Sequence, residues 1–180
     1  MASLAAELRN RSWTKDSYLI STDASLISIP DLNAAFASDS FYWATSLPEP
    51  AMQEMLQNSL CFGLHSTTPR LVGFARLVTD LVTFAYVTDV WVDPSAQGRG
   101  LGGWLVGCVQ ETIESMPHLR RSLLFTGSWD RSVPFYERLM KMTVVGGQPG
   151  ASLAVLQMKG RGAPGLFKDR VVSCLAGSFV

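Results

Sequence analysis

Four glycines, one glutamine and one arginine lie within seven residues, in the run QGRGLGG from Gln97 to Gly103. Glycine costs chain entropy on folding, so this density indicates close approach of a ligand or unusual backbone angles. A strand-like run precedes the glycines, and a helix-like run follows them. Several backbone N–H groups would then lie at a helix N-terminus, where the helix dipole favours negative charge. The run therefore predicts a phosphate-binding loop.

Three kinds of phosphate loop compete for this run. The Walker loop requires a Lys-Ser or Lys-Thr pair after its glycines, and none follows here. The dinucleotide-binding loop belongs to a parallel β-α-β unit, whereas the strands expected before these glycines form an antiparallel meander. The acyl-CoA loop Q/R-x-x-G-x-G/A remains, and it is matched by Gln97, Gly100 and Gly102.

The longer stretch TDVWVDPSAQGRGLGGWLV, residues 88–106, resembles the core motif of the GNAT superfamily of acyl-CoA-dependent N-acetyltransferases. The later FYERL run and the order of elements from Tyr18 to Lys159 are similar to that family as well. The resemblance implies acetyl-CoA as co-substrate, with its pyrophosphate on the loop amides and its pantetheine arm along the preceding strand. The cofactor-binding residues implied in this way are Val90, Val92, Gln97, Gly98, Arg99, Gly100, Leu101, Gly102 and Gly103. The Arg99 side chain is either a phosphate ligand or a solvated loop residue.

Acyl transfer to an amine needs two proton transfers. An alkylamine with a pKa near ~10.4 must lose a proton before it attacks a thioester, and the departing thiolate must be protonated or stabilised. The resemblance implies that Tyr136, in PFYERLM, lies close to the CoA sulfur as the general acid. The alternative is a core tyrosine on an amphipathic helix.

Asp89 is the one carboxylate within the apolar strand FAYVTDVWV. Strict alternation predicts that Ala85, Val87, Asp89 and Trp91 share one face of this strand, and that Val90 and Val92 lie on the other. A carboxylate at this position either faces a cleft, where partial burial suits it to accept the ammonium proton, or is paired. Arg76 on the neighbouring strand is the expected partner in the second case.

The elements that must position these residues follow from periodicity. Strands are expected in SYLISTD, in both halves of CFGLHSTTPRLVGFARLVTD, and in TFAYVTDVWVD, SLLFTGSW and SLAVLQMKG. Helices are expected between residues 29 and 60, from near Gly98, and in SVPFYERLM. The fold class is α/β: a single GNAT-fold domain with a mixed, mostly antiparallel central sheet, the loop helix on one face and the early helices on the other. We expect this domain at residues 1–160 and a C-terminal tail at 161–180.

Two positions depart from the family pattern. The glycine that commonly ends the tyrosine helix is replaced by Met140, so that helix end must be built differently. The asparagine often found seven residues before the tyrosine is Trp129 here, and Arg131 or Ser132 is then the candidate for its CoA contact.

Composition limits the partners. Lys+Arg and Asp+Glu both total 15, so neither nucleic acid nor a membrane surface is expected to bind. Three scattered cysteines and two histidines argue against a metal site and against a disulfide framework. No long apolar segment begins the chain, which favours a cytoplasmic protein, with a nuclear one as the alternative. A homodimer is left open.

The expected acceptor side contains Phe41, Tyr42, Trp43 and Trp129, with Asp39, Glu49 and Glu54 as scattered acids. Aromatic side chains with few carboxylates suit a small amine with an apolar body, unless these rings simply cover the core. The predicted function is transfer of acetyl from acetyl-CoA to a small-molecule amine by direct attack in a ternary complex. The alternatives are an acyl-CoA-binding or interaction module without transferase activity, and reuse of the fold for another reaction on a hydrophobic ligand.

Overall fold

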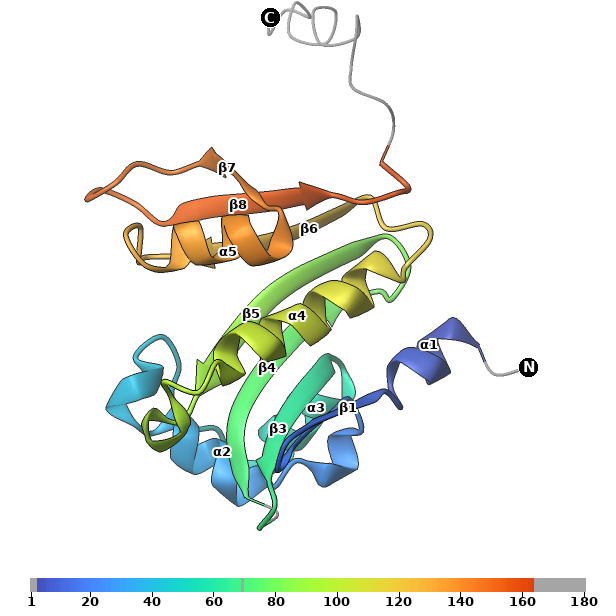
Figure 1. Cartoon of the computed structure of the whole chain (residues 1–180), viewed down its shortest axis with the longest axis vertical. Coiled ribbons are helices and arrows are strands. Elements are labelled where there is room, and N and C mark those ends of the chain that lie inside the picture. Colours follow the sequence, from blue (N-terminus) through green and yellow to red (C-terminus); the bar gives the residue numbers. More distant parts are fainter. Residues whose placement is uncertain (1–2, 69, 164–180) are drawn as a thin grey trace, which may run out of the picture.

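Eight strands form one twisted sheet in the computed structural model, which describes residues 3–68 and 70–163 (Figure 1). The strands follow the spatial order β1-β2-β3-β4-β5-β6-β8-β7. Their bounds are β1 Ser12–Lys15, β2 Tyr18–Ser21, β3 Leu60–Ser66, β4 Leu71–Thr79, β5 Phe84–Val92, β6 Arg121–Thr126, β7 Thr143–Gly146 and β8 Ala154–Lys159. The helices are α1 Leu4–Leu8, α2 Ile29–Phe36, α3 Glu49–Gln57, α4 Leu101–Glu114 and α5 Ser132–Met140.

The parallel pair β5–β6 divides the sheet into two halves. All the other neighbouring strands pair antiparallel. β5 and β6 pair only from Phe84↔Arg121 to Val87↔Leu124, whereas β5 continues to Val92 along β4. The carboxyl-terminal ends of β5 and β6 therefore diverge, and Figure 1 shows the β5–α4 half and the β6–β8–α5 half opening away from each other.

Separate apolar clusters cover the two faces of the sheet. Leu105 and Val109 of α4 pack with the larger cluster, together with Phe62 of β3. Leu32 of α2 and Phe74 of β4 belong to the smaller cluster, with residues of α3. Because adjacent strand residues point to opposite faces, the loop helix and the early helices lie on opposite sides of the sheet, as the sequence predicts.

The alternation predicted for β5 is wrong beyond Val87. Ala85 and Val87 pack in the α4 cluster, but so do Val90 and Val92, while Trp91 packs in the α2–α3 cluster. The physical reason is a β-bulge: the register with β4 shifts between Phe74 and Arg76, opposite Asp89, which has a φ of +54°. An extra residue in one strand reverses which side chains face each side from that point on.

Other boundaries differ less from the prediction. α5 begins and ends at the predicted residues, and the three strands β3, β4 and β5 form the predicted meander. α4 begins at Leu101 instead of near Gly98, because Gly98 and Gly100 have positive φ values that a right-handed helix does not accommodate. Three short elements, α1, β1 and β7, are not predicted from the sequence. Of the tail expected at 161–180, residues 164–180 lie outside the described residues.

Candidate active site

The glycine loop connects the end of β5 to α4 and has an open surface. Gly98 and Gly100 have φ values of +78° and +73°, which other residues rarely adopt. A Cβ added at either position would meet no atom within 4 Å. Asp93 accepts the amide of Ser95 and the Gln97 side chain donates to the carbonyl of Val92, so the start of the loop is fixed internally.

The amino-terminal turn of α4 supplies hydrogen-bond donors. Gly100 is the N-cap residue and provides no side-chain cap, while the first backbone bond into the helix runs from the Trp104 amide to the Gly100 carbonyl. Within the described residues, the amides of Leu101, Gly102 and Gly103 have no backbone acceptor outside the helix. Together with the helix dipole, these amides can bind an anion of phosphate size.

A cleft of about 350 Å³ lies where β5 and β6 diverge. It brings together three of the residues predicted for catalysis or cofactor binding: Asp89, Val90 and Tyr136. The loop residues Gln97 to Gly103 do not line this cleft; they lie at the end of β5 where α4 begins. The predicted site therefore has two parts, an anion-binding helix end and a cleft between the strands.

Asp89 is paired, which is the second of the two alternatives drawn from the sequence. Its Oδ2 accepts a hydrogen bond of 2.7 Å from Nε of Arg76 on β4, and its Oδ1 lies 3.2 Å from the Thr88 hydroxyl. The side chains of Asp89 and Arg76 are 8% and 19% exposed. Nη1 of Arg76 also donates a hydrogen bond of 3.3 Å to the hydroxyl of Ser59. Asp89 is nevertheless one of the residues that line the cleft.

Tyr136 lies on α5 and faces the cleft across from β5. Its ring packs edge-on against Phe135, with 5.2 Å between ring centroids. Burial raises the pKa of the Tyr136 phenol to about 12, so the hydroxyl stays protonated at neutral pH. A protonated phenol can donate a hydrogen bond to a developing thiolate.

The positions that depart from the family pattern have clear structural roles. The indole Nε1 of Trp129 donates to the carbonyl of Ser152 at 2.9 Å, so this side chain anchors the segment before β8. Ser132 lines the cleft, whereas Arg131 is exposed and does not. α5 ends at Met140, and its C-cap residue Lys141 takes the left-handed conformation, with φ +53°, that glycine usually supplies.

The expected acceptor residues divide into two groups. Tyr42 and Trp43, which follow the turn at Asp39–Phe41, line the cleft and are 75% and 44% exposed. Phe41 is fully buried in the α2–α3 cluster and serves the core. The scattered acids Asp39, Glu49 and Glu54 are exposed and do not line the cleft. The Arg99 side chain is also exposed, and its Nη1 donates to the Tyr18 hydroxyl at 2.9 Å.

The aromatic wall on the strands is not predicted from the sequence. Tyr86 of β5 and Phe125 of β6 line the cleft, with 5.3 Å between their ring centroids. The available signal is alternation: Val87 and Leu124 are buried under α4, so their neighbours Tyr86 and Phe125 must face the opposite side.

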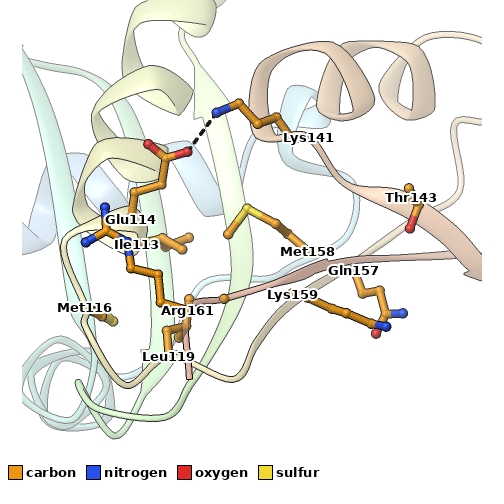
Figure 2. Close-up of a pocket in the computed structure, with 11 residues that line it drawn as sticks. Ile113, Glu114, Met116, Leu119, Lys141, Thr143, Gln157, Met158, Lys159 and Arg161 are labelled. Atoms are coloured by element: carbon orange, nitrogen blue, oxygen red, sulfur yellow. Dashed lines mark hydrogen bonds and ion pairs between the residues drawn. The ribbon is translucent and has the colours of Figure 1, made fainter. Parts of the chain in front are cut away.

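A second cavity, of about 640 Å³, lies at the far end of α4 (Figure 2). Its side chains come from the end of α4, the start of β7 and the end of β8, and Figure 2 shows Lys141 reaching Glu114, with Nζ 3.1 Å from Oε1. None of the predicted site residues lines it. Within residues 3–68 and 70–163, no group of three or more His, Cys, Asp or Glu side chains could hold a metal ion. No helix in the same ranges is long and apolar enough to cross a membrane.

A sheet that opens between two parallel strands, next to a glycine-rich helix end, is the architecture expected of the GNAT superfamily. A sequence profile described as "Acetyltransferase (GNAT) family" matches residues 29–142, so the chain belongs to this family.

Known proteins resemble the chain both in sequence and in structure. A candidate acetyltransferase of Gibberella zeae is 39% identical over 133 residues, which cover 64% of this chain and 75% of that protein. The crystal structure of a candidate GNAT-family acetyltransferase from Xanthomonas campestris pv. campestris is 32% identical, covers 69% of this chain and 84% of that one, and has a TM-score of 0.58. A GNAT-family acetyltransferase from Elizabethkingia anophelis, solved with acetyl-CoA bound, is 13% identical with a TM-score of 0.57, over 81% of this chain and 99% of that one.

Proposed function

We propose that the protein is an acyl-CoA-dependent N-acyltransferase that transfers acetyl from acetyl-CoA to the amine of a small molecule. The observation that carries this proposal is the divergence of β5 and β6 between the glycine loop and Tyr136. The family membership supports it, and the Elizabethkingia anophelis relative has acetyl-CoA bound.

The residues around the loop and along β5 fit acetyl-CoA. The amides at the start of α4 are suited to its pyrophosphate, and the open space over Gly98 and Gly100 leaves room for it. The pairing of β5 with β6 ends at Val87, so the main chain at Val90 is available to pair with an extended amide-containing chain. At Val92 the carbonyl already accepts from the Gln97 side chain, which such a chain would have to displace. The Arg99 guanidinium lies on the loop and can add a charge-assisted contact after leaving Tyr18.

Bound acetyl-CoA supplies the thioester that a neutral amine attacks to give an amide and free CoA. Asp89 is the group in the cleft that can accept the ammonium proton, directly or through a water molecule. Tyr136 donates its phenolic hydrogen bond toward the departing sulfur. A phenol with a pKa of about 12 is a weak acid beside a thiol near ~8.5, so stabilisation by hydrogen bonding is the larger part of this role.

Direct attack in a ternary complex is favoured over a covalent acyl-enzyme. Cys61 and Cys108 are both buried, and burial raises the pKa of each thiol to about 12, which keeps both protonated. Ser132 lines the cleft, but none of the described residues lining the cleft is a histidine that could activate it. The described residues therefore offer the cleft no activated nucleophile.

Steady-state kinetics of the Tyr136→Phe variant test this proposal. We expect kcat to fall by about 100-fold, because the sulfur loses its hydrogen-bond donor. We expect the calorimetric Kd for acetyl-CoA to stay within about threefold, because Tyr136 is not part of the loop. An unchanged kcat would overturn the role of Tyr136, and a wild-type protein that binds acetyl-CoA without turning over any amine would favour the interaction-module alternative.

A further inference from the structure

We infer that the acceptor is a primary amine with a flat apolar body and no other charged group; this rests on the proposed function and deepens it. Besides Tyr136, four aromatic rings line the cleft, on two walls. Tyr42 and Trp43 form one wall, edge to face with 4.9 Å between centroids. Tyr86 and Phe125 form the other, tilted at 55°.

Three of these four rings are exposed in spite of their size, and Tyr86 is half-buried. Tyr42 is 75%, Trp43 44% and Phe125 48% exposed, whereas Phe41 next to them is completely buried. Large aromatic side chains gathered at one concave site indicate a binding surface, because their exposure otherwise costs free energy. A flat apolar group between the two walls would bury the exposed faces of both.

The rings lie on the acceptor side of the sheet. Tyr86 and Phe125 alternate with Val87 and Leu124, which pack in the α4 cluster. Their side chains consequently project to the face opposite α4 and its glycine loop. Acetyl-CoA held at the start of α4 would enter the cleft from the α4 face, leaving the aromatic walls for the second substrate.

Charge excludes most other amines. Among the described residues lining the cleft, Asp89 is the one charged side chain, and Arg76 already engages its Oδ2. A carboxylate or phosphate on the acceptor would find no lysine, arginine or histidine there, and a second ammonium would find no second carboxylate. Free amino acids, diamines and lysine-rich peptides would each bring a charge into the cleft without a partner.

Size argues in the same direction. A cleft of about 350 Å³ must hold both the acetyl thioester and the acceptor, which leaves room for a single ring with a short linker. The hydroxyls of Thr88, Thr126 and Ser132, which also line the cleft, can accept one neutral polar substituent.

The test compares 2-phenylethylamine, phenylalanine, 1,4-diaminobutane and a short lysine-containing peptide with saturating acetyl-CoA, following release of free CoA thiol. We expect kcat/KM for 2-phenylethylamine to exceed the other values by at least about tenfold. Phenylalanine is the sharpest comparison, because it adds only a carboxylate to the same ring and amine. Equal or better turnover of phenylalanine, the diamine or the peptide would overturn the inference.

Variants of the wall supply a second readout. Phe125→Ala should raise KM for 2-phenylethylamine by about tenfold while changing kcat little. Phe84→Ala is the matched control, because Phe84 is an exposed aromatic of β5 that does not line the cleft. The KM of this variant for 2-phenylethylamine should equal that of the wild type. Equal effects of the two variants would contradict the assignment.

Acetyl-CoA binding, measured by calorimetry on the same samples, separates this inference from the proposed function. If the protein binds acetyl-CoA and acetylates another amine but not 2-phenylethylamine, the inferred acceptor class is overturned and the proposed function stands. Absence of binding overturns the proposed function, and the inference with it.

Discussion

Nε of Arg76 on β4 lies 2.7 Å from Oδ2 of Asp89 on β5, at the bulge that follows the last pair between β5 and β6, Val87↔Leu124. This ion pair fixes the one β5 residue with a left-handed backbone, φ +54°, at the place where the cleft begins. The same contact therefore positions a carboxylate in the cleft and stabilises the irregular backbone that opens it.

Removing the arginine should destabilise the fold. In the Arg76→Met variant the Asp89 carboxylate, only 8% exposed, would have no cationic partner. We expect the free energy of unfolding to fall by about 3 kcal/mol, measured by urea denaturation. The double variant Arg76→Met/Asp89→Asn should recover part of this loss, because asparagine is neutral and tolerates a positive φ. A double variant less stable than Arg76→Met would show that the pair is not the origin of the effect.

The phenol of Tyr136 gives a pH dependence with a definite sign. Its pKa is raised to about 12 in the folded protein, against about 10 when unfolded. The stability linked to this group is therefore fully present below pH 10 and is lost as the pH rises toward 12. Between pH 10 and pH 12 the free energy of unfolding of the wild type should fall by about 2–3 kcal/mol more than that of Tyr136→Phe. Urea denaturation at several pH values measures this difference. Cys61 and Cys108 contribute equally in both proteins, so parallel pH curves would contradict a buried phenol.

Two glycines around α4 should respond oppositely to alanine. Gly107 is exposed in the middle of the helix, and its added Cβ would meet no atom within 4 Å. We expect Gly107→Ala to raise the melting temperature and to increase the free energy of unfolding by about 0.8 kcal/mol. Gly100 has a φ of +73°, so Gly100→Ala should lower stability by about 1 kcal/mol. Equal signs for the two substitutions would mean that the loop backbone is not left-handed.

The end of α5 gives a further comparison of backbone strain. Lys141 has φ +53° and its Nζ lies 3.1 Å from Oε1 of Glu114 (Figure 2). Lys141→Gly and Lys141→Ala both lose this ion pair, but only glycine adopts the left-handed conformation without strain. The glycine variant should therefore be more stable than the alanine variant by about 1 kcal/mol, by chemical denaturation. An alanine variant more stable than the glycine variant would contradict the left-handed conformation of residue 141.

Much of the fold could be predicted from the sequence because its patterns are local. SVPFYERLM has helical periodicity, and Ser132–Met140 is the helix observed. The meander β3–β4–β5 follows from three apolar runs separated by turn residues. β1 and β7 could not be predicted in this way, because their residues are mostly exposed and do not alternate. α1 is a five-residue helix, too short for a periodic signal.

Of the site, only the local glycine-rich motif could be predicted from the sequence. Gln97 to Gly103 precede the amino-terminal turn of α4 as expected, since loop and helix adjoin in sequence. The side that each residue of β5 faces after Val87 could not be predicted, because the bulge is formed by Asp89 and not by a glycine that would mark it. The wall formed by Phe125 required knowing that β6 pairs with β5, a contact between distant segments.

The most direct test of the central claim is calorimetric titration of the wild type with acetyl-CoA, next to Gly100→Glu and Gly107→Glu. Both variants add one carboxylate near α4, but only residue 100 lies at its amino-terminal end; Gly107 is exposed on the middle of the helix. We predict wild-type binding with a Kd near 1 μM, about −8 kcal/mol, retained in Gly107→Glu and lost in Gly100→Glu. Binding of equal strength in Gly100→Glu, or none in the wild type, would contradict the assignment of the glycine loop to the CoA pyrophosphate.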